Sequence, residues 1–266
     1  MKKIVLITGV SKNIGKSICK KYTDNGYQVI GTYKDFLDDS VELQKFKTEF
    51  SNVILHKVDL CNQSDVTKFI DEMKQYKFDA IVNNAGMLNM MPDKSVRNEF
   101  YHFDLQAFIN VTSCNFISVA RICLELKQCI NENGNIVIIS SGAGSNGAFA
   151  SISYNATKAA LINLTQSLSN SFYSFKKIRV NSVSPGWISG EGGAMNTNDD
   201  NPMMQNVAKV TPMGRNGITT EVADVVFYLT SEQASFITGA NIAVDGGYSQ
   251  FDVIYYEEAT GKSLLK

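Results

Sequence analysis

The sequence is poor in the residues from which metal sites and disulfide frameworks are built. It has only two histidines, His56 and His102, so a histidine-based metal centre is unexpected and we predict no bound metal. The five cysteines are odd in number and scattered, without the spacings of a zinc knuckle or a disulfide framework. This pattern indicates a reducing compartment, and we expect a cytoplasmic protein.

The chain also lacks an excess of charge, many prolines and long apolar runs. Its 25 basic and 26 acidic residues leave a net charge of −1, so no overall field favours nucleic acid or an anionic membrane. Four prolines and a hydrophobic content of 44% are typical of a globular chain rather than a disordered one. We see no apolar stretch that approaches membrane-spanning length, and the run Ile4–Ile7 is too short for a signal peptide.

Short β-branched runs alternate with segments of helical periodicity along most of the chain. This alternation predicts an α/β fold with a doubly wound parallel sheet of the Rossmann type, in a single domain over residues 1–249. Ser64 and Thr219 are the expected N-caps of two of its helices. The expected strands are 3–7, 27–33, 53–58, 79–82, 136–139, 178–183 and 241–244, and the expected helices include 16–25, 41–50, 64–76, 98–130 and 219–229.

A serine, a tyrosine and a lysine flank a glycine-rich loop in the middle of the chain. Ser141 ends a predicted strand, and Tyr154 and Lys158 lie four residues apart, on one face of the helix that follows. A free tyrosine has a pKa of about 10, and we expect the neighbouring ammonium to lower it. A serine hydroxyl could hold a substrate oxygen beside the phenol. The set suits proton transfer coupled to hydride transfer, although a tyrosine and lysine at this spacing also occur on solvated helix faces.

The first predicted strand leads into a turn that carries Gly9 and Gly15 and opens a helix. A strand, a glycine-bearing turn and a helix N-terminus together form an anion site, because backbone N–H groups face a phosphate there. Many β–α turns need a glycine, so the position directly after the first strand is what strengthens this interpretation.

Taken together, these motifs resemble the classical short-chain dehydrogenase/reductase family, especially its 3-oxoacyl-carrier-protein reductase and its sugar or alcohol dehydrogenase branches. The resemblance extends from Lys3 to Ser249. The matching residues are Thr8-Gly9 with Gly15, Asp59, Asn83-Asn84-Ala85-Gly86, Ser141, Tyr154 with Lys158, Pro185-Gly186, Phe236–Gly239 and Asp245–Tyr248.

The resemblance implies roles for four residues. Tyr154 would be the general acid in carbonyl reduction and the base in alcohol oxidation, while Lys158 would lower its pKa and hold the nicotinamide ribose. Ser141 would polarise the substrate carbonyl. The family's fourth catalytic residue is an asparagine; the helix pattern favours Asn110, and the distance to Ser141 keeps Asn115 as the alternative.

The resemblance also implies a dinucleotide site, from which the chain departs at two positions. Asn13 stands where the family has the middle glycine of the phosphate turn, and Gly190, next to Ser189, stands where it usually has a threonine. The implied dinucleotide contacts are Gly9, Ser11, Lys12, Asn13, Ile14, Gly15, Tyr33, Lys34, Asp59, Leu60, Asn84, Ala85, Gly86, Tyr154, Lys158, Pro185, Gly186 and Ile188.

The end of the second strand bears on the choice of cofactor. An NAD site usually has a carboxylate there, but the family spacing places Tyr33 at this position. Lys34 and Lys12 suit a 2′-phosphate, so NADP(H) is favoured. Asp35 supports the opposite choice. If the match to the family spacing is off by one or two residues, a carboxylate stands at this position and an NAD(H) site is expected.

We therefore expect an oxidoreductase that interconverts a ketone and a secondary alcohol, with a substrate lid over residues 189–212. The alternatives are an NAD-dependent alcohol or sugar dehydrogenase and, from another class, a non-catalytic dinucleotide-binding sensor or scaffold. Relatives of this kind assemble as homotetramers or homodimers, and we expect the same. The C-terminal extension, residues 250–266, carries an apolar cluster that would pack on a neighbouring subunit or on its own.

Overall fold

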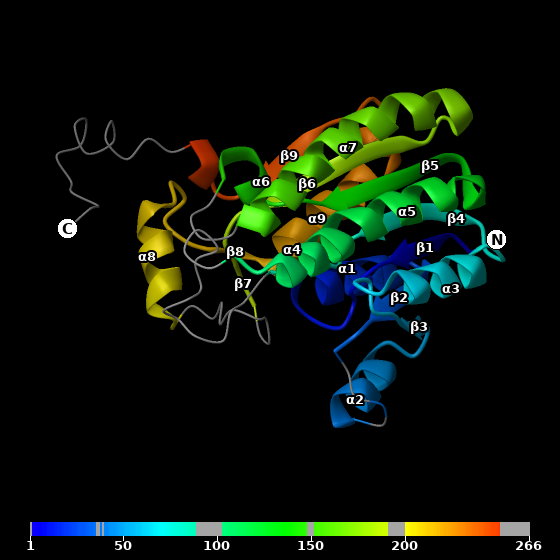
Figure 1. The fold of residues 1–266 in the computed structure, drawn as a ribbon, viewed down its shortest axis with the longest axis horizontal. Helices are drawn as coiled ribbons and strands as arrows, with labels where there is room; N and C mark the ends of the chain where they lie inside the picture. Colours follow the sequence, from blue (N-terminus) through cyan, green and yellow to red (C-terminus); the bar gives the residue numbers. More distant parts are fainter. Residues whose placement is uncertain are drawn as a thin grey trace.

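Seven strands form one parallel sheet in the computed structural model, in the order β3-β2-β1-β4-β5-β6-β9 (Figure 1). The structure describes residues 2–35, 38, 40–88, 103–147, 152–190 and 200–250. The strands are β1 (Ile4–Ile7), β2 (Gln28–Tyr33), β3 (Ile54–Lys57), β4 (Phe78–Asn83), β5 (Ile130–Ile139), β6 (Arg179–Pro185) and β9 (Asn241–Val244), and a separate parallel pair consists of β7 (Ile188–Ser189) and β8 (Gly217–Ile218).

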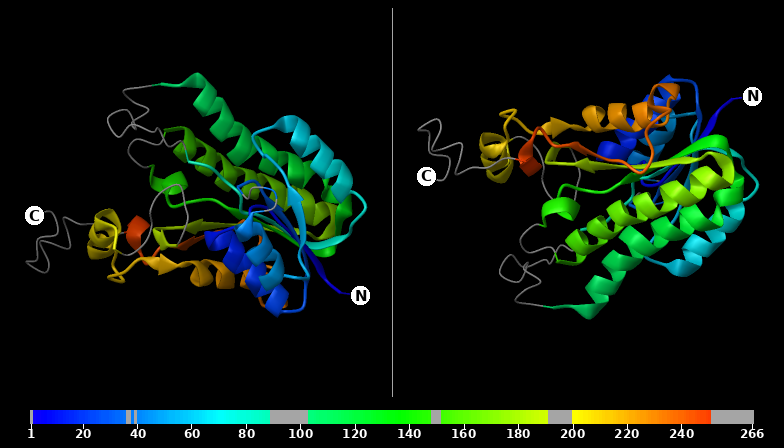
Figure 2. Two further views of the ribbon diagram at one scale, coloured as in Figure 1. Left: turned by 90° about the horizontal axis from the view of Figure 1, so that it is seen from below. Right: turned by 90° about the horizontal axis from the view of Figure 1, so that it is seen from above.

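Helices cover both faces of the sheet (Figure 2). Each strand points alternate side chains to opposite faces, so Leu6 of β1 packs into one core while Val5 and Ile7 pack into the other. The first core receives α3 (Gln63–Met73), the helical segment α4–η2–α5 (Leu105–Thr112, Ser113–Ile117 and Ser118–Glu125) and α7 (Ile152–Lys176); the second receives α1 (Asn13–Asp24), α2 (Val41–Glu49) and α9 (Thr219–Leu229). The predicted doubly wound fold is therefore confirmed.

Several element boundaries differ from the prediction. β5 begins at Ile130, and its register with β4 shifts between Phe78 and Ala80. The N-cap of α3 is Asn62 rather than Ser64, since its side-chain oxygen accepts the first N–H groups of the helix. The extension 251–266 and lid residues 191–199 lie outside the described residues; the described part of the lid includes α8 (Pro202–Val210).

The predicted N-cap of α9 is also displaced by one residue. Ile218 is the N-cap in place of Thr219, and the Glu221 carboxylate accepts the N–H of Ile218 at 2.9 Å. Glu221, from within the first turn, thus satisfies a backbone N–H at the exposed start of this helix.

The segment Leu105–Glu125 corrects the expectation that no apolar stretch approaches membrane-spanning length. By length and composition alone this helix could cross a membrane. In the structure, however, Val111, Ile122 and Cys123 on it are fully buried, and the segment packs along α7 and the sheet. Its apolar character is therefore that of a core helix, which must bury one face against a sheet.

The carboxyl ends of the central strands meet at one edge of the sheet. From β1 the chain proceeds outward to β2 and β3, whereas β4, β5 and β6 extend in the opposite direction, so β1 and β4 flank a topological switch point. In open α/β sheets, ligands bind in the crevice outside the strand ends at such a point. The fold thus predicts where a site should lie before any side chain is considered.

Arg179, at the start of β6, ties the sheet to the segment after α9. It is 8% exposed, and its guanidinium donates to the carbonyl oxygens of Leu229 at 2.8 Å, Ser231 at 3.0 Å and Ile237 at 3.1 Å. Each of these carbonyls would lose a charged donor if the side chain were apolar.

We predict that Arg179→Met lowers the free energy of unfolding by about 3 kcal/mol, because three carbonyl groups lose their charged donor. Urea denaturation followed by circular dichroism measures this. The matched control is Lys20→Met, which removes an exposed pair with Asp24 and should change stability by about 0.5 kcal/mol or less. Equal, small effects of the two substitutions would contradict the role assigned to Arg179.

Candidate active site

A polar clamp holds the turn after β1 against the end of β4. The Thr8 hydroxyl accepts the backbone N–H groups of Asn84 and Ala85, both at 3.0 Å. In return, the Asn84 amide donates to the carbonyls of Thr8 at 3.1 Å and Gly9 at 2.9 Å. The Asn84 side chain is thereby committed to the protein backbone, so its contribution to a ligand is to position the turn.

Two glycines in this turn allow a backbone approach that no side chain would permit. Gly9 has a φ of +73°, in the left-handed region. A Cβ on Gly15 would lie 1.8 Å from the Gly9 carbonyl oxygen, so the start of α1 packs directly on the turn. Any residue other than glycine at position 15 would force these two segments apart.

The N-terminus of α1 opens onto this turn. Among the described residues, no side chain caps its first N–H groups, and its first turn carries no acidic residue. Uncapped N–H groups at the positive end of a helix are the usual donors to a phosphate. Ser11 and Ile14 belong to the same turn, and the Ile14 side chain packs against the core below it.

Ser141, Tyr154 and Lys158 come together at the same sheet edge, as the sequence predicts. The Ser141 hydroxyl lies near enough to the Tyr154 phenol to affect its pKa, and the Lys158 ammonium lies 5.5 Å from the centre of the Tyr154 ring. Burial raises the pKa of Tyr154 above its usual value, and the neighbouring Ser141 hydroxyl lowers it by less. The expected net lowering of this pKa is therefore wrong for the protein alone, and the phenol holds its proton at neutral pH.

Lys158 is almost fully buried, with 4% of its surface exposed. Its ammonium donates to the Ile139 carbonyl oxygen at 2.8 Å, and burial lowers its pKa to about 8. Its own carbonyl accepts the Ser140 hydroxyl at 2.7 Å, which fixes the helix to the end of β5. The side chain therefore presents a largely protonated ammonium at neutral pH from a fixed position.

The structure brings Asn115 rather than Asn110 to this site. Asn115 is fully buried in the π-helical turn η2; its side chain accepts the Met87 N–H at 2.7 Å and donates to the Met87 carbonyl at 2.8 Å. A Cβ built on Gly86 would lie 3.4 Å from both the Asn115 oxygen and the Lys158 ammonium. Asn110 instead accepts the Gln106 amide on the exposed side of α4, so the geometry favours the alternative that the sequence left open.

Two ion pairs lie at the end of β2, where an adenine ribose is expected. Lys34 pairs with Asp59 at 2.9 Å, and Lys12 of the turn pairs with Asp35. Burial of Asp59 opposes its charge, but hydrogen bonds from Lys34 and from the Cys61 N–H outweigh this and lower the pKa of Asp59. Both lysines that the sequence assigns to a 2′-phosphate therefore lie at the end of β2, and each is paired with a carboxylate.

The remaining predicted contacts lie at the end of β2, after β3 and beyond β6. Tyr33 ends β2 and is 9% exposed, while the side chain of Leu60 is in the hydrophobic core, which leaves only its backbone to face a ligand. Beyond β6, the Pro185 carbonyl accepts the Gly142 N–H at 3.0 Å, and Ile188 packs against the core beneath β7.

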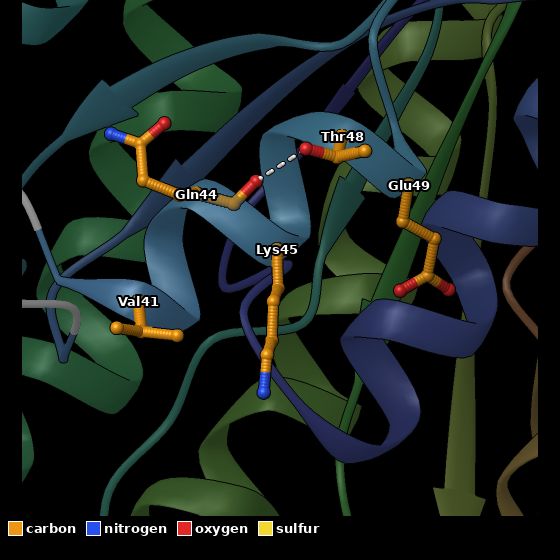
Figure 3. A pocket seen from close by; sticks show the side chains of 5 residues that line it. All are labelled: Val41, Gln44, Lys45, Thr48 and Glu49. Carbon is orange, nitrogen blue, oxygen red and sulfur yellow. Dashed lines mark hydrogen bonds between the residues drawn. The ribbon is translucent and has the colours of Figure 1, made fainter.

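A surface hollow elsewhere on the molecule is a poor candidate for the site. It runs along the outer face of α2 and is lined by Val41, Gln44, Lys45, Thr48 and Glu49 (Figure 3). It is wide open to solvent and lacks convergent catalytic groups, and Glu49 is already paired with Lys16. The strand-end crevice, with its anion-binding turn and its buried lysine, is the better candidate.

Comparison with protein families agrees with this geometry. The family described as Enoyl-(Acyl carrier protein) reductase matches residues 9–249, from the phosphate turn to the end of the sheet. The chain belongs to the short-chain dehydrogenase/reductase family. This result confirms the resemblance on which the site residues were assigned.

Curated relatives of this dehydrogenase/reductase chain match it over nearly its full length. The 3-oxoacyl-(acyl-carrier-protein) reductase FabG of Buchnera aphidicola subsp. Schizaphis graminum is 33% identical over 258 residues, covering 92% of this chain and 97% of the relative. The glucose 1-dehydrogenase 2 of Bacillus subtilis is 27% identical, covering 94% of this chain and 95% of that protein. The family thus includes similar chains with different named substrates.

Solved structures show the same fold. A short-chain dehydrogenase/reductase from Serratia marcescens superposes with a TM-score of 0.81 at 25% identity, covering 93% of this chain and 98% of that one. BdcA in complex with NADPH superposes with a TM-score of 0.81 at 24% identity, covering 94% and 96%.

Sequence reasoning missed two hydroxyl groups that order the catalytic helix. The Thr157 hydroxyl donates to the Tyr154 carbonyl at 2.8 Å and accepts the Asn115 amide at 3.3 Å, which links the helix to η2. The Ser140 hydroxyl donates to the Lys158 carbonyl and so links the same helix to the end of β5. Both residues neighbour a predicted catalytic residue, and this adjacency was the only signal in the sequence.

We predict that Asn115→Ala reduces turnover by about tenfold or more and costs about 1–3 kcal/mol of stability, because the Met87 backbone groups lose their buried partners. The matched control is Asn110→Ala, which removes a half-buried amide bonded only to Gln106 and should change stability by about 0.5 kcal/mol or less with full turnover. Turnover is measured well below both melting temperatures, so that unfolding does not contribute. Loss of turnover in the Asn110 variant alone would restore the first assignment.

Proposed function

We propose that this protein is an NADP(H)-dependent reductase that interconverts a ketone and a secondary alcohol. The observation that carries the proposal is the grouping of Ser141, Tyr154 and the buried Lys158 at the strand edge where the turn at Gly9 offers an anion site. When bound there, the nicotinamide dinucleotide supplies or accepts the hydride.

The residues of the chain supply the proton and the orientation. The Tyr154 phenol keeps its proton at neutral pH because burial raises its pKa, so it can protonate a carbonyl oxygen that gains charge during reduction. Ser141 places a second hydroxyl beside the same oxygen. The Lys158 ammonium stabilises negative charge near the phenol, and in alcohol oxidation the proton moves back to Tyr154.

The dinucleotide would lie along the switch point. The uncapped start of α1 suits its diphosphate, and Lys158 suits the nicotinamide ribose. Lys12 and Lys34 at the end of β2 support NADP(H), since a 2′-phosphate needs cations there. Asp35 favours the alternative, an NAD-dependent alcohol or sugar dehydrogenase, because a carboxylate at this edge can accept the ribose 2′-hydroxyl.

The relatives suggest the first substrates to test. Because several of them are named 3-oxoacyl-(acyl-carrier-protein) reductases, 3-oxoacyl thioesters are the leading ketones in our proposal. We also propose a cytoplasmic homotetramer or homodimer. Its support is the row of exposed apolar residues on α4, η2 and α5, namely Leu105, Ile109, Ile117 and Leu124, which a second copy would cover.

We predict that Tyr154→Phe reduces turnover by about 10³-fold, because general acid catalysis contributes on the order of 10²–10⁴. NADPH affinity should stay within about twofold, since the phenol hydroxyl faces the substrate oxygen. The assay follows nicotinamide absorbance over a panel of 3-oxoacyl thioesters, simple ketones and sugars, each with NADPH and with NADH.

The control for this assay is Tyr173→Phe, which removes an exposed phenol on the same helix and should leave turnover unchanged. Wild-type-like turnover of the Tyr154 variant would contradict the role of Tyr154 as the proton donor. Binding of a dinucleotide without turnover on any member of the panel would favour the sensor or scaffold.

A further inference from the structure

Asn13, in the phosphate turn, has an unusual backbone and an unusual side chain. Its φ is +48°, in the left-handed region that most residues other than glycine avoid. Its side-chain oxygen is buried and has no hydrogen-bond partner among the described residues. A buried polar atom without a partner is costly, so the position of this side chain needs a structural explanation.

Gly190, directly after β7, forms the wall that faces this side chain. A Cβ built on Gly190 would lie 2.6 Å from the Asn13 side-chain oxygen and 3.1 Å from its Cγ. Real Cβ atoms essentially never approach another atom this closely, so any side chain at position 190 would displace the Asn13 amide. The phosphate turn and the wall beyond β6 are therefore in contact through this one side chain.

The contact explains two departures that look unrelated in the sequence. The chain has an asparagine where similar chains have a glycine, and a glycine where they usually have a threonine. In the structure these positions face each other, and a side chain present at one of them takes the space of a side chain at the other.

We infer that Asn13 and Gly190 form a reciprocal pair, in which the Asn13 amide fills the space left at position 190 and contacts the diphosphate of the bound dinucleotide. The inference rests on the dinucleotide binding proposed above. The Asn13 oxygen faces Gly190, and the N–H groups on the other side of the amide are the donors for phosphate oxygens. Asn13 is thus a positioning residue for the cofactor.

The first test is a double-mutant cycle of Asn13→Gly and Gly190→Ala, with affinities measured by fluorescence titration of NADPH and of NADH. In the Asn13 protein, Gly190→Ala should weaken dinucleotide binding by about fivefold or more, because coupled neighbours share about 1 kcal/mol or more. In the Asn13→Gly protein the same substitution should have no effect. The melting temperature of each unliganded variant is the second readout, and Gly190→Ala should lower it only when Asn13 is present.

Asn13→Asp tests the contact with the diphosphate. The substitution keeps the shape of the side chain but places a carboxylate beside an anion, so dinucleotide affinity should fall by about tenfold or more at low salt while the unliganded protein keeps its melting temperature. The matched control is Asn25→Asp, at the exposed far end of α1, which should bind both dinucleotides as the wild type does.

The experiments distinguish failure of the Asn13–Gly190 pair from failure of the proposed function. Additive effects in the cycle, or unchanged affinity in Asn13→Asp, would overturn the reciprocal pair while the proposed function stands. A wild-type protein that binds neither dinucleotide would overturn the proposed function and the inference with it.

Discussion

The site depends on one interaction, the polar clamp between Thr8 and Asn84. Thr8 directly follows β1 and Asn84 directly follows β4, the two neighbouring strands at the switch point. Four hydrogen bonds of 2.9 to 3.1 Å join Thr8 and Gly9 to Asn84 and Ala85. Because both partners are committed to each other, the width of the crevice is set without a ligand. Such preorganisation reduces the ordering cost of binding, and it lets Gly9 and Gly15 hold the start of α1 close to the anion site.

The catalytic helix is ordered by a second set of buried polar contacts. Lys158 is held by a backbone carbonyl rather than by a carboxylate, so its ammonium can interact with groups in the crevice. Burial acts in opposite senses on its two ionisable residues: it raises the pKa of Tyr154 and lowers that of Lys158. At neutral pH the site therefore offers a neutral acid beside a cation, the pair of charge states that carbonyl reduction requires.

Patterns local to the chain predicted most of the fold and the three central site residues. Apolar runs identified the strands because parallel strands are buried on both faces, and the i, i+4 spacing placed Tyr154 and Lys158 on one face. The sequence left Asn110 and Asn115 open as the fourth residue and favoured Asn110, whereas the geometry favours Asn115, which lies in the π-helical turn Ser113–Ile117. No local sequence pattern predicts such a π-helical turn.

Other features depend on contacts between distant segments, which a single sequence does not reveal. The direction of the Tyr154 pKa was mistaken because the spacing shows the lysine but not the burial of the phenol. The contact between Asn13 and Gly190 likewise joins a turn near the start of the chain to a wall formed much later. The two positions are far apart in the sequence, and only the structure shows that they face each other.

The central claim is that a nicotinamide dinucleotide binds outside the carboxyl ends of β1 and β4. Amide hydrogen exchange of the wild-type protein, with and without saturating NADPH or NADH, tests it most directly and needs no substrate. The account predicts slower exchange in peptides that cover residues 9–16 and 84–88, with no change in α2. Protection confined to α2, or unchanged exchange in the turn at Gly9 when the dinucleotide is bound, would contradict it.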